Sequence, residues 1–164
     1  MIDKTFPITE KLILNALQLA QQLQQELIKE ADVLKKTQHA EQISNIAANK
    51  KQLVAQLEQF NTQLAQVLAT EKLPHNQESI NEYFRRAKAS GLLATDSSNH
   101  WELLMRVCLE CRTLNEQNGA CIELLSRHTN RSLDILKGKP AFANTYGADG
   151  IARSDRYTRP LISV

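Results

Sequence analysis

Hydrophobic residues recur every three or four positions along most of this chain, which is the spacing of one face of an α-helix. In the first part of the chain they are Leu12, Ala16, Leu19, Leu23, Leu27, Ala31 and Leu34. Thr9, which follows Pro7, is expected to be the N-cap residue. Lys35 and Lys36 place positive charge at the carboxyl end, where the helix dipole favours it. The pattern predicts a helix over about 9–35.

A second stretch repeats the pattern with heptad regularity. Its core positions are Ile43, Ile46, Lys50, Leu53, Leu57, Phe60, Leu64 and Val67. Steps that alternate between three and four are typical of a left-handed coiled-coil seam, and Lys50 is the one polar residue in it. Pro74 stops this helix, which we expect over about 40–71. The short link to the first helix predicts an antiparallel helical hairpin.

The pattern is weaker over residues 74–99. A short helix is expected over 79–89, closed by Ser90 and Gly91. Asp96 to Asn99 is interpreted as a loop that leads into the next helix. With Asn99 as the N-cap residue, Glu102 falls three positions later, which is the spacing of a capping box.

The last long helix is expected over about 99–137. Its seam comprises Leu104, Val107, Cys111, Leu114, Asn118, Cys121, Leu125, His128, Ser132 and Ile135. The seam is mixed from Asn118 onward, and Gly119 lies within the helix at a cost of about 1 kcal/mol relative to Ala. A core Asn either forms hydrogen bonds within one bundle or sets the choice of partner, and both interpretations stay open. This less complete half predicts a surface for an amphipathic partner helix.

Gly138 is expected directly after the end of the helix. The periodicity is lost over 139–164, where we expect a flexible tail. Within that tail Tyr146 precedes Gly147 and Gly150, which on composition alone is typical of a turn. The predicted fold is therefore all-α. It is an antiparallel helical hairpin plus a long C-terminal helix, forming an elongated coiled-coil-like bundle over 1–138, followed by the tail.

Composition narrows the functional classes. The 164 residues carry a formal net charge of +2, which is too small to indicate nucleic acid or a membrane surface as a partner. No apolar run approaches the ~20 residues that span a bilayer, and the first residues lack the pattern of a signal peptide. The 3 cysteines are typical of reduced thiols in the cytoplasm. We expect a cytoplasmic protein with no direct membrane insertion.

Candidate chemistry is sparse. Cys108 and Cys111 form a CxxC pair, with Cys121 and His128 downstream. On one continuous helix Cys111 and Cys121 lie about 15 Å apart along the axis, so they cannot share a metal ion. Buried seam cysteines are the better interpretation. The histidines lack a nucleophile at an interpretable spacing, and no Gly-rich phosphate loop or paired-carboxylate motif occurs. We expect no enzyme activity, no metal and no cofactor.

The C-terminal third carries a more specific signal. The segments 114–119 (LNEQNG), 133–136 (LDIL) and 145–150 (TYGADG), together with Ile122 and Arg127, resemble the FlgN family. That family comprises bacterial flagellar type III export chaperones for hook-associated proteins, which form the hook–filament junction. The resemblance implies a small, all-helical cytoplasmic chaperone that binds the amphipathic C-terminal helices of its clients. Such binding prevents premature assembly or degradation of the client before export.

The resemblance also implies roles for individual residues. Client binding is expected at Leu114, Asn115, Asn118, Gly119, Cys121, Ile122, Leu125, Leu133 and Leu136. Tyr146 and Gly147 are expected to dock the loaded chaperone on the cytoplasmic domain of the flagellar export gate. The alternative function is a coiled-coil adaptor or structural protein without an export client, which forms homodimers through the Ile43–Val67 seam.

Overall fold

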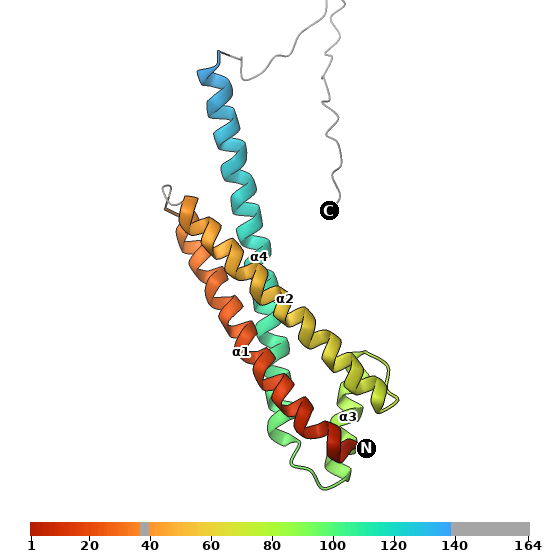
Figure 1. Ribbon diagram of the computed structural model, residues 1–164. Helices are drawn as coiled ribbons and strands as arrows, with labels where there is room; N and C mark the ends of the chain where they lie inside the picture. Colours follow the sequence, from red (N-terminus) through yellow and green to blue (C-terminus); the bar gives the residue numbers. More distant parts are fainter. Residues whose placement is uncertain (37–39, 139–164) are drawn as a thin grey trace, which may run out of the picture. The chain divides into compact units, whose positions relative to one another are not determined.

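The computed structural model describes residues 1–36 and 40–138 (Figure 1). Within these residues the chain forms four helices and no strand, so the predicted all-α fold is confirmed. The helices are α1 (Ile2–Leu34), α2 (Ala40–Thr70), α3 (Gln77–Ala89) and α4 (Thr95–Leu136). The chain divides into two compact units, Met1–Ile122 and a second that begins at Glu123.

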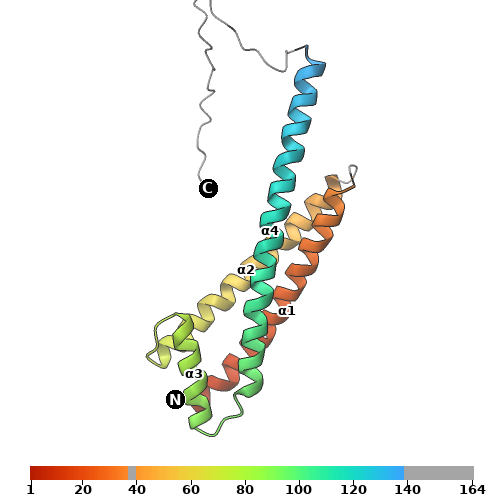
Figure 2. The ribbon, with the colours of Figure 1, turned by 180° about the vertical axis from the view of Figure 1, so that it is seen from behind.

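Helices α1 and α2 form the predicted antiparallel hairpin, and both ribbon views show them side by side (Figures 1 and 2). Polar contacts tie the two helices together at both ends. Glu30 pairs with Lys50 near the connection between the helices. Thr5 donates a hydrogen bond of 2.8 Å to the Glu71 carboxylate at the other end. These two contacts fix the register of the hairpin.

Helix α1 begins at Ile2, so the prediction of Thr9 as its N-cap is wrong. Ile2 and Phe6 are buried and extend the apolar stripe toward the amino end of the helix. Their burial stabilises the first turns despite the internal Pro7. Thr9 is buried inside the helix. Its hydroxyl hydrogen-bonds to the carbonyl of Thr5 at 3.0 Å and shares a hydrogen bond of 3.0 Å with the hydroxyl of Tyr83.

Helix α3 has clear local signals at both ends. The side chain of Asn76 accepts a hydrogen bond of 2.8 Å from the amide of Ser79, which makes Asn76 the N-cap. At the other end Gly91 has a positive φ of 80°, and the amide of Leu92 bonds back to the carbonyl of Ala87 at 3.1 Å. This is the Schellman arrangement, in which glycine relieves the strain of the left-handed conformation.

Helix α4 begins at Thr95, so Asn99 lies inside the helix and the predicted capping box is wrong. Burial explains the earlier start, because Ala94 and Ser97 are both fully enclosed in the bundle. The amide of Ser98 already donates to the carbonyl of Ala94 at 3.0 Å. Tertiary packing therefore extends the helix through a stretch whose residues favour a loop.

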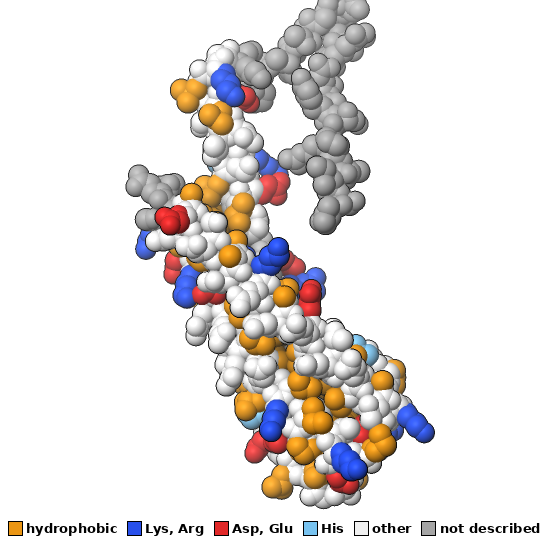
Figure 3. Space-filling view, viewed as in Figure 1, with side chains coloured by type: hydrophobic (Ala, Val, Ile, Leu, Met, Phe, Trp, Pro, Cys, Tyr) orange, Lys and Arg blue, Asp and Glu red, His pale blue; other side chains and the backbone are white. Residues whose placement is uncertain are grey.

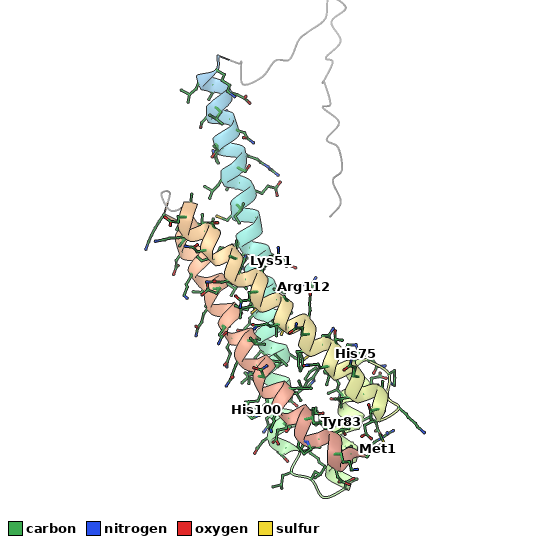
Figure 4. All side chains as sticks on the ribbon, in the orientation of Figure 1. Met1, Lys51, His75, Tyr83, His100 and Arg112 are labelled. Atoms are coloured by element: carbon green, nitrogen blue, oxygen red, sulfur yellow. The ribbon has the colours of Figure 1, made fainter. Side chains whose placement is uncertain are left out.

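The core is concentrated where α3 packs between the ends of the longer helices. Its largest members come from all four helices: Ile2, Phe6, Ile13, Leu64, Leu68, Ile80, Tyr83, Phe84, Trp101 and Leu104. Figure 4 shows Tyr83 of α3 beside the first turns of α1. The segment 74–94 therefore closes this end of the bundle.

Candidate functional site

The final part of α4 presents an apolar stripe that the rest of the described chain leaves exposed. Every residue from Ile122 to Leu136 is exposed. Ile122 is 42% exposed and Leu133 is 43% exposed, and Leu125 and Leu136 are exposed as well. At about 100° per residue these four side chains fall on one face of the helix, with Thr129 between them. Apolar surface exposed to water in this way is unfavourable, and such patches typically mark sites of interaction with another molecule.

The residues predicted for client binding divide into two groups. Leu114 and Cys121 are half-buried, and Leu114 packs against the core of the bundle. Asn115 and Gly119 are exposed, as are the four residues of the stripe. Apart from the neighbouring backbone of α4 itself, no atom of the described residues lies within 4 Å of the position that a Cβ on Gly119 would occupy. The surface around Gly119 is therefore open to close approach by another backbone.

Asn118 belongs to the interior of the bundle. It is 4% exposed, and its side-chain amide donates hydrogen bonds of 2.9 Å to the carbonyl of Leu27 and 2.9 Å to the carboxylate of Glu30. Of the two interpretations left open by the sequence, these contacts favour a hydrogen-bonded core Asn. Among the residues predicted for client binding, Asn118 is therefore the one whose side chain is fully committed to contacts within the bundle.

Lys50, the polar residue in the predicted seam of α2, contacts the same carboxylate that Asn118 contacts. Its ammonium donates to both carboxylate oxygens of Glu30, at 2.7 and 2.8 Å. The side chains of Glu30 and Lys50 are 3% and 19% exposed, so the pair is largely removed from water. One polar cluster, formed by Glu30, Lys50 and Asn118, thus connects α1, α2 and α4. Such clusters specify the register of packed helices at some cost in stability.

An apolar groove runs between α2 and α4 in the unit Met1–Ile122, and α1 also lines one end of it. It consists of two adjoining cavities of about 300 Å³ and about 290 Å³, which share Val54, Leu57 and Cys108. The first continues toward Lys50 and Arg112, and the second toward Phe60 and Trp101. Figure 3 shows hydrophobic side chains gathered in a band beside the carboxyl-terminal half of α2. Sequence periodicity missed this groove, because it arises where two helices with apolar faces diverge.

Of the cysteines interpreted as buried residues of the seam, Cys111 is buried, whereas Cys108 and Cys121 are half-buried. Cys108, Cys111 and Cys121 are free thiols. Burial raises the pKa of the Cys111 thiol to about 11, and burial also raises the pKa of Cys108. The thiol of Cys111 contacts the carbonyl of Ala20 at 3.5 Å. In the described part of the chain no three His, Cys, Asp or Glu side chains converge as a metal site would require.

Two observations concern the coiled-coil and docking hypotheses. Ile46, Leu53 and Leu64 of the α2 seam are buried within the chain itself, which leaves little of that seam for a homodimeric coiled coil. Tyr146 and Gly147, predicted to dock on the export gate, lie outside the described residues.

A protein-family model with the description FlgN protein matches residues 7–154, which is most of the chain. The chain belongs to the FlgN family. Membership confirms the family resemblance carried by the C-terminal motifs, and it supports a general function as a flagellar export chaperone. Comparison with curated proteins and with solved structures finds no match. None of the described helices has the length and apolar character needed to cross a membrane.

Proposed function

We propose that this FlgN-family chaperone binds the amphipathic C-terminal helices of hook-associated proteins through the exposed part of α4 and delivers them to the flagellar export gate. The observation that carries the proposal is the apolar stripe from Ile122 to Leu136, which no other residue of the described ranges 1–36 and 40–138 covers. A client helix with a matching stripe covers it in the manner of two helices packing side by side.

The physical properties of the stripe suit a reversible complex. Only polar residues lie between Leu125 and Leu133, and one of them, Thr129, interrupts the stripe near its middle. A contact of this composition buries less apolar surface than an obligate interface does, and a client that orders on binding loses conformational entropy. The resulting affinity is moderate, which allows the client to be released at the export gate.

The leading test uses two substitutions on opposite faces of one helix. Leu133→Asp places a charge in the stripe, whereas Ile135→Asp places the same charge about 200° away around the helix. Both side chains are exposed, so both variants are expected to fold. We expect Leu133→Asp to weaken binding of C-terminal peptides from hook-associated proteins at least tenfold in calorimetry. Equal effects of the two variants would show that the stripe is not the client surface.

Delivery to the gate is assigned to Tyr146 and Gly147. The support for this assignment is the TYGADG segment, which lies within the part of the chain matched by the family model. Tyrosine contributes a large contact area with little loss of rotamer freedom, so it suits a docking role. We expect Tyr146→Ala to retain client binding and to weaken association with the cytoplasmic domain of the export gate in a pull-down assay. Loss of both activities together would contradict this division of roles.

A further inference from the structure

Asn118 is the last buried residue of α4 within the described part of the chain. The three buried positions before it, Leu104, Val107 and Cys111, are hydrophobic. After it, every residue over 119–136 is exposed or half-buried. The buried side of α4 therefore ends on a polar side chain. Because burial of a polar group is unfavourable unless its hydrogen bonds are satisfied, the contacts of Asn118 define what holds this point of the helix.

The amide of Asn118 is fixed to two acceptors on α1. Its nitrogen donates to the carbonyl of Leu27 and to the carboxylate of Glu30, each at 2.9 Å. Lys50 of α2 holds that carboxylate in place, because its ammonium donates to both carboxylate oxygens. Two acceptors about one turn apart on α1 restrict the rotation of α4 about its own axis as well as its position. The turn that contains Asn118 is therefore held in the helical conformation by contacts from outside the helix.

The helix beyond this point receives little support from its own sequence. Residues 123–136 belong to the second compact unit, and none of them is buried. Gly119 weakens the helix directly after Asn118. Several residues of the segment are weak helix formers: Ser126, His128, Thr129, Asn130, Ser132 and Asp134. A helix of this length without a packed face is marginal in water, mainly because forming its first turn is unfavourable. The segment therefore depends on the turn that precedes it.

A turn that is already helical removes this cost of nucleation. Helix α4 is continuous from Thr95 to Leu136, so backbone hydrogen bonds extend from the turn at Asn118 into residues 119–136 one residue at a time. We propose that Asn118 is a positioning residue for the client surface, because its hydrogen bonds to Leu27 and Glu30 supply the helical template for residues 119–136. The template sets the fraction of chains in which the apolar stripe is formed, since the stripe residues share one face only at helical spacing. The link to client binding rests on the proposed function.

The wild-type chain provides the first test. NMR secondary chemical shifts of the Cα atoms measure the helical population at each residue of the full chain. We expect values typical of a complete helix up to Asn118 and a progressive fall from Gly119 toward Leu136, as a helix supported at one end shows. A profile that keeps its full value through Leu136 would overturn the proposal, because Asn118 could not set a population that is already complete.

Asn118→Ala tests the template directly. The substitution removes both hydrogen bonds, and we expect the mean helical population of residues 123–136 to fall about twofold. Intrinsic propensity predicts the opposite change, because Ala is the better helix former. No fall, or a rise, would therefore refute the template. If this variant does not fold, the wild-type profile still decides the question.

Cys111→Ala is the matched control. It removes part of another buried side chain from the same helix, about two turns before Asn118, and leaves the hydrogen bonds of Asn118 in place. We expect it to lower the stability of the bundle in urea titration and to leave the helical population of residues 123–136 unchanged. An equal loss of helix in Cys111→Ala and Asn118→Ala would show that general stability, and not Asn118, supports the segment.

Calorimetry with a C-terminal peptide of a hook-associated protein connects the template to the client. Only chains with the helical segment carry the stripe, so the Kd of Asn118→Ala should rise by the same factor by which the helical population of residues 123–136 falls. A higher Kd with an unchanged population would overturn the proposal, because Asn118 would then contact the client directly. If the population falls as expected but the peptide does not bind the wild type, the proposed function fails and the template stands.

Discussion

The buried pair of Glu30 and Lys50 gives the sharpest test of how this bundle is held together. Lys50→Met keeps the length and the apolar stem of the side chain and removes its charge. The carboxylate of Glu30, with a side chain 3% exposed, then retains the hydrogen bond of 2.9 Å from Asn118 and loses two from the ammonium. Removing one partner of a buried pair typically costs about 3–5 kcal/mol.

The structure places the expected cost near the lower end of that range. The side chain of Lys50 is 19% exposed, so some water reaches the pair, and Asn118 continues to stabilise the carboxylate. We therefore expect Lys50→Met to lower the free energy of unfolding by about 3 kcal/mol. Urea titration followed by circular dichroism at neutral pH measures this change.

Two further variants make the result interpretable. Lys51→Met changes the same residue type one position along, where the side chain is exposed, and should alter stability by less than about 0.5 kcal/mol. Glu30→Gln combined with Lys50→Met removes both charges, so it should cost less than Lys50→Met alone. The reasoning is refuted if Lys50→Met costs no more than Lys51→Met.

Three other predictions follow from local geometry. Gly119→Ala should stabilise the isolated chain by about 0.5–1 kcal/mol, since a Cβ there meets no other atom, and should weaken client binding in calorimetry if a client approaches closely. The hydrogen bond of 2.6 Å from Lys29, together with one from Asn49, lowers the pKa of Glu26 in the folded chain. The ionised carboxylate therefore stabilises the fold at pH values above its unfolded pKa, and this contribution is lost as the pH falls through the lower folded pKa. Glu26→Gln should therefore show a smaller loss of stability than the wild type when denaturation is repeated from pH 6 down to pH 3. Cys111, whose pKa is raised to about 11, should resist alkylation at pH 8 until urea unfolds the chain, as peptide mass spectrometry can follow.

The sequence pattern was sufficient for the helical class, the α1–α2 hairpin and the approximate extent of α2. Heptad spacing reports which residues face a neighbour, and it is strong over long helices. The motifs around residues 114–119 and 145–150 were sufficient for the family. These signals are local in sequence, so they survive without knowledge of the packing. The starts of α1 and α4 could not be predicted from such local signals. Burial of Ile2, Phe6 and Ala94 outweighed the cap and loop signals next to them.

Tertiary structure decided how the polar residues of the seams are used. Periodicity marked Lys50 and Asn118 as anomalies, but it gave no means of knowing that both meet Glu30, which lies on a third helix. It also gave no means of separating the buried Asn118 from the exposed residues that follow it in the predicted client site. The groove between α2 and α4 depends on how two helices diverge. Sequence periodicity determines which face of each helix is apolar, whereas the packing of the helices determines which of those faces stay uncovered.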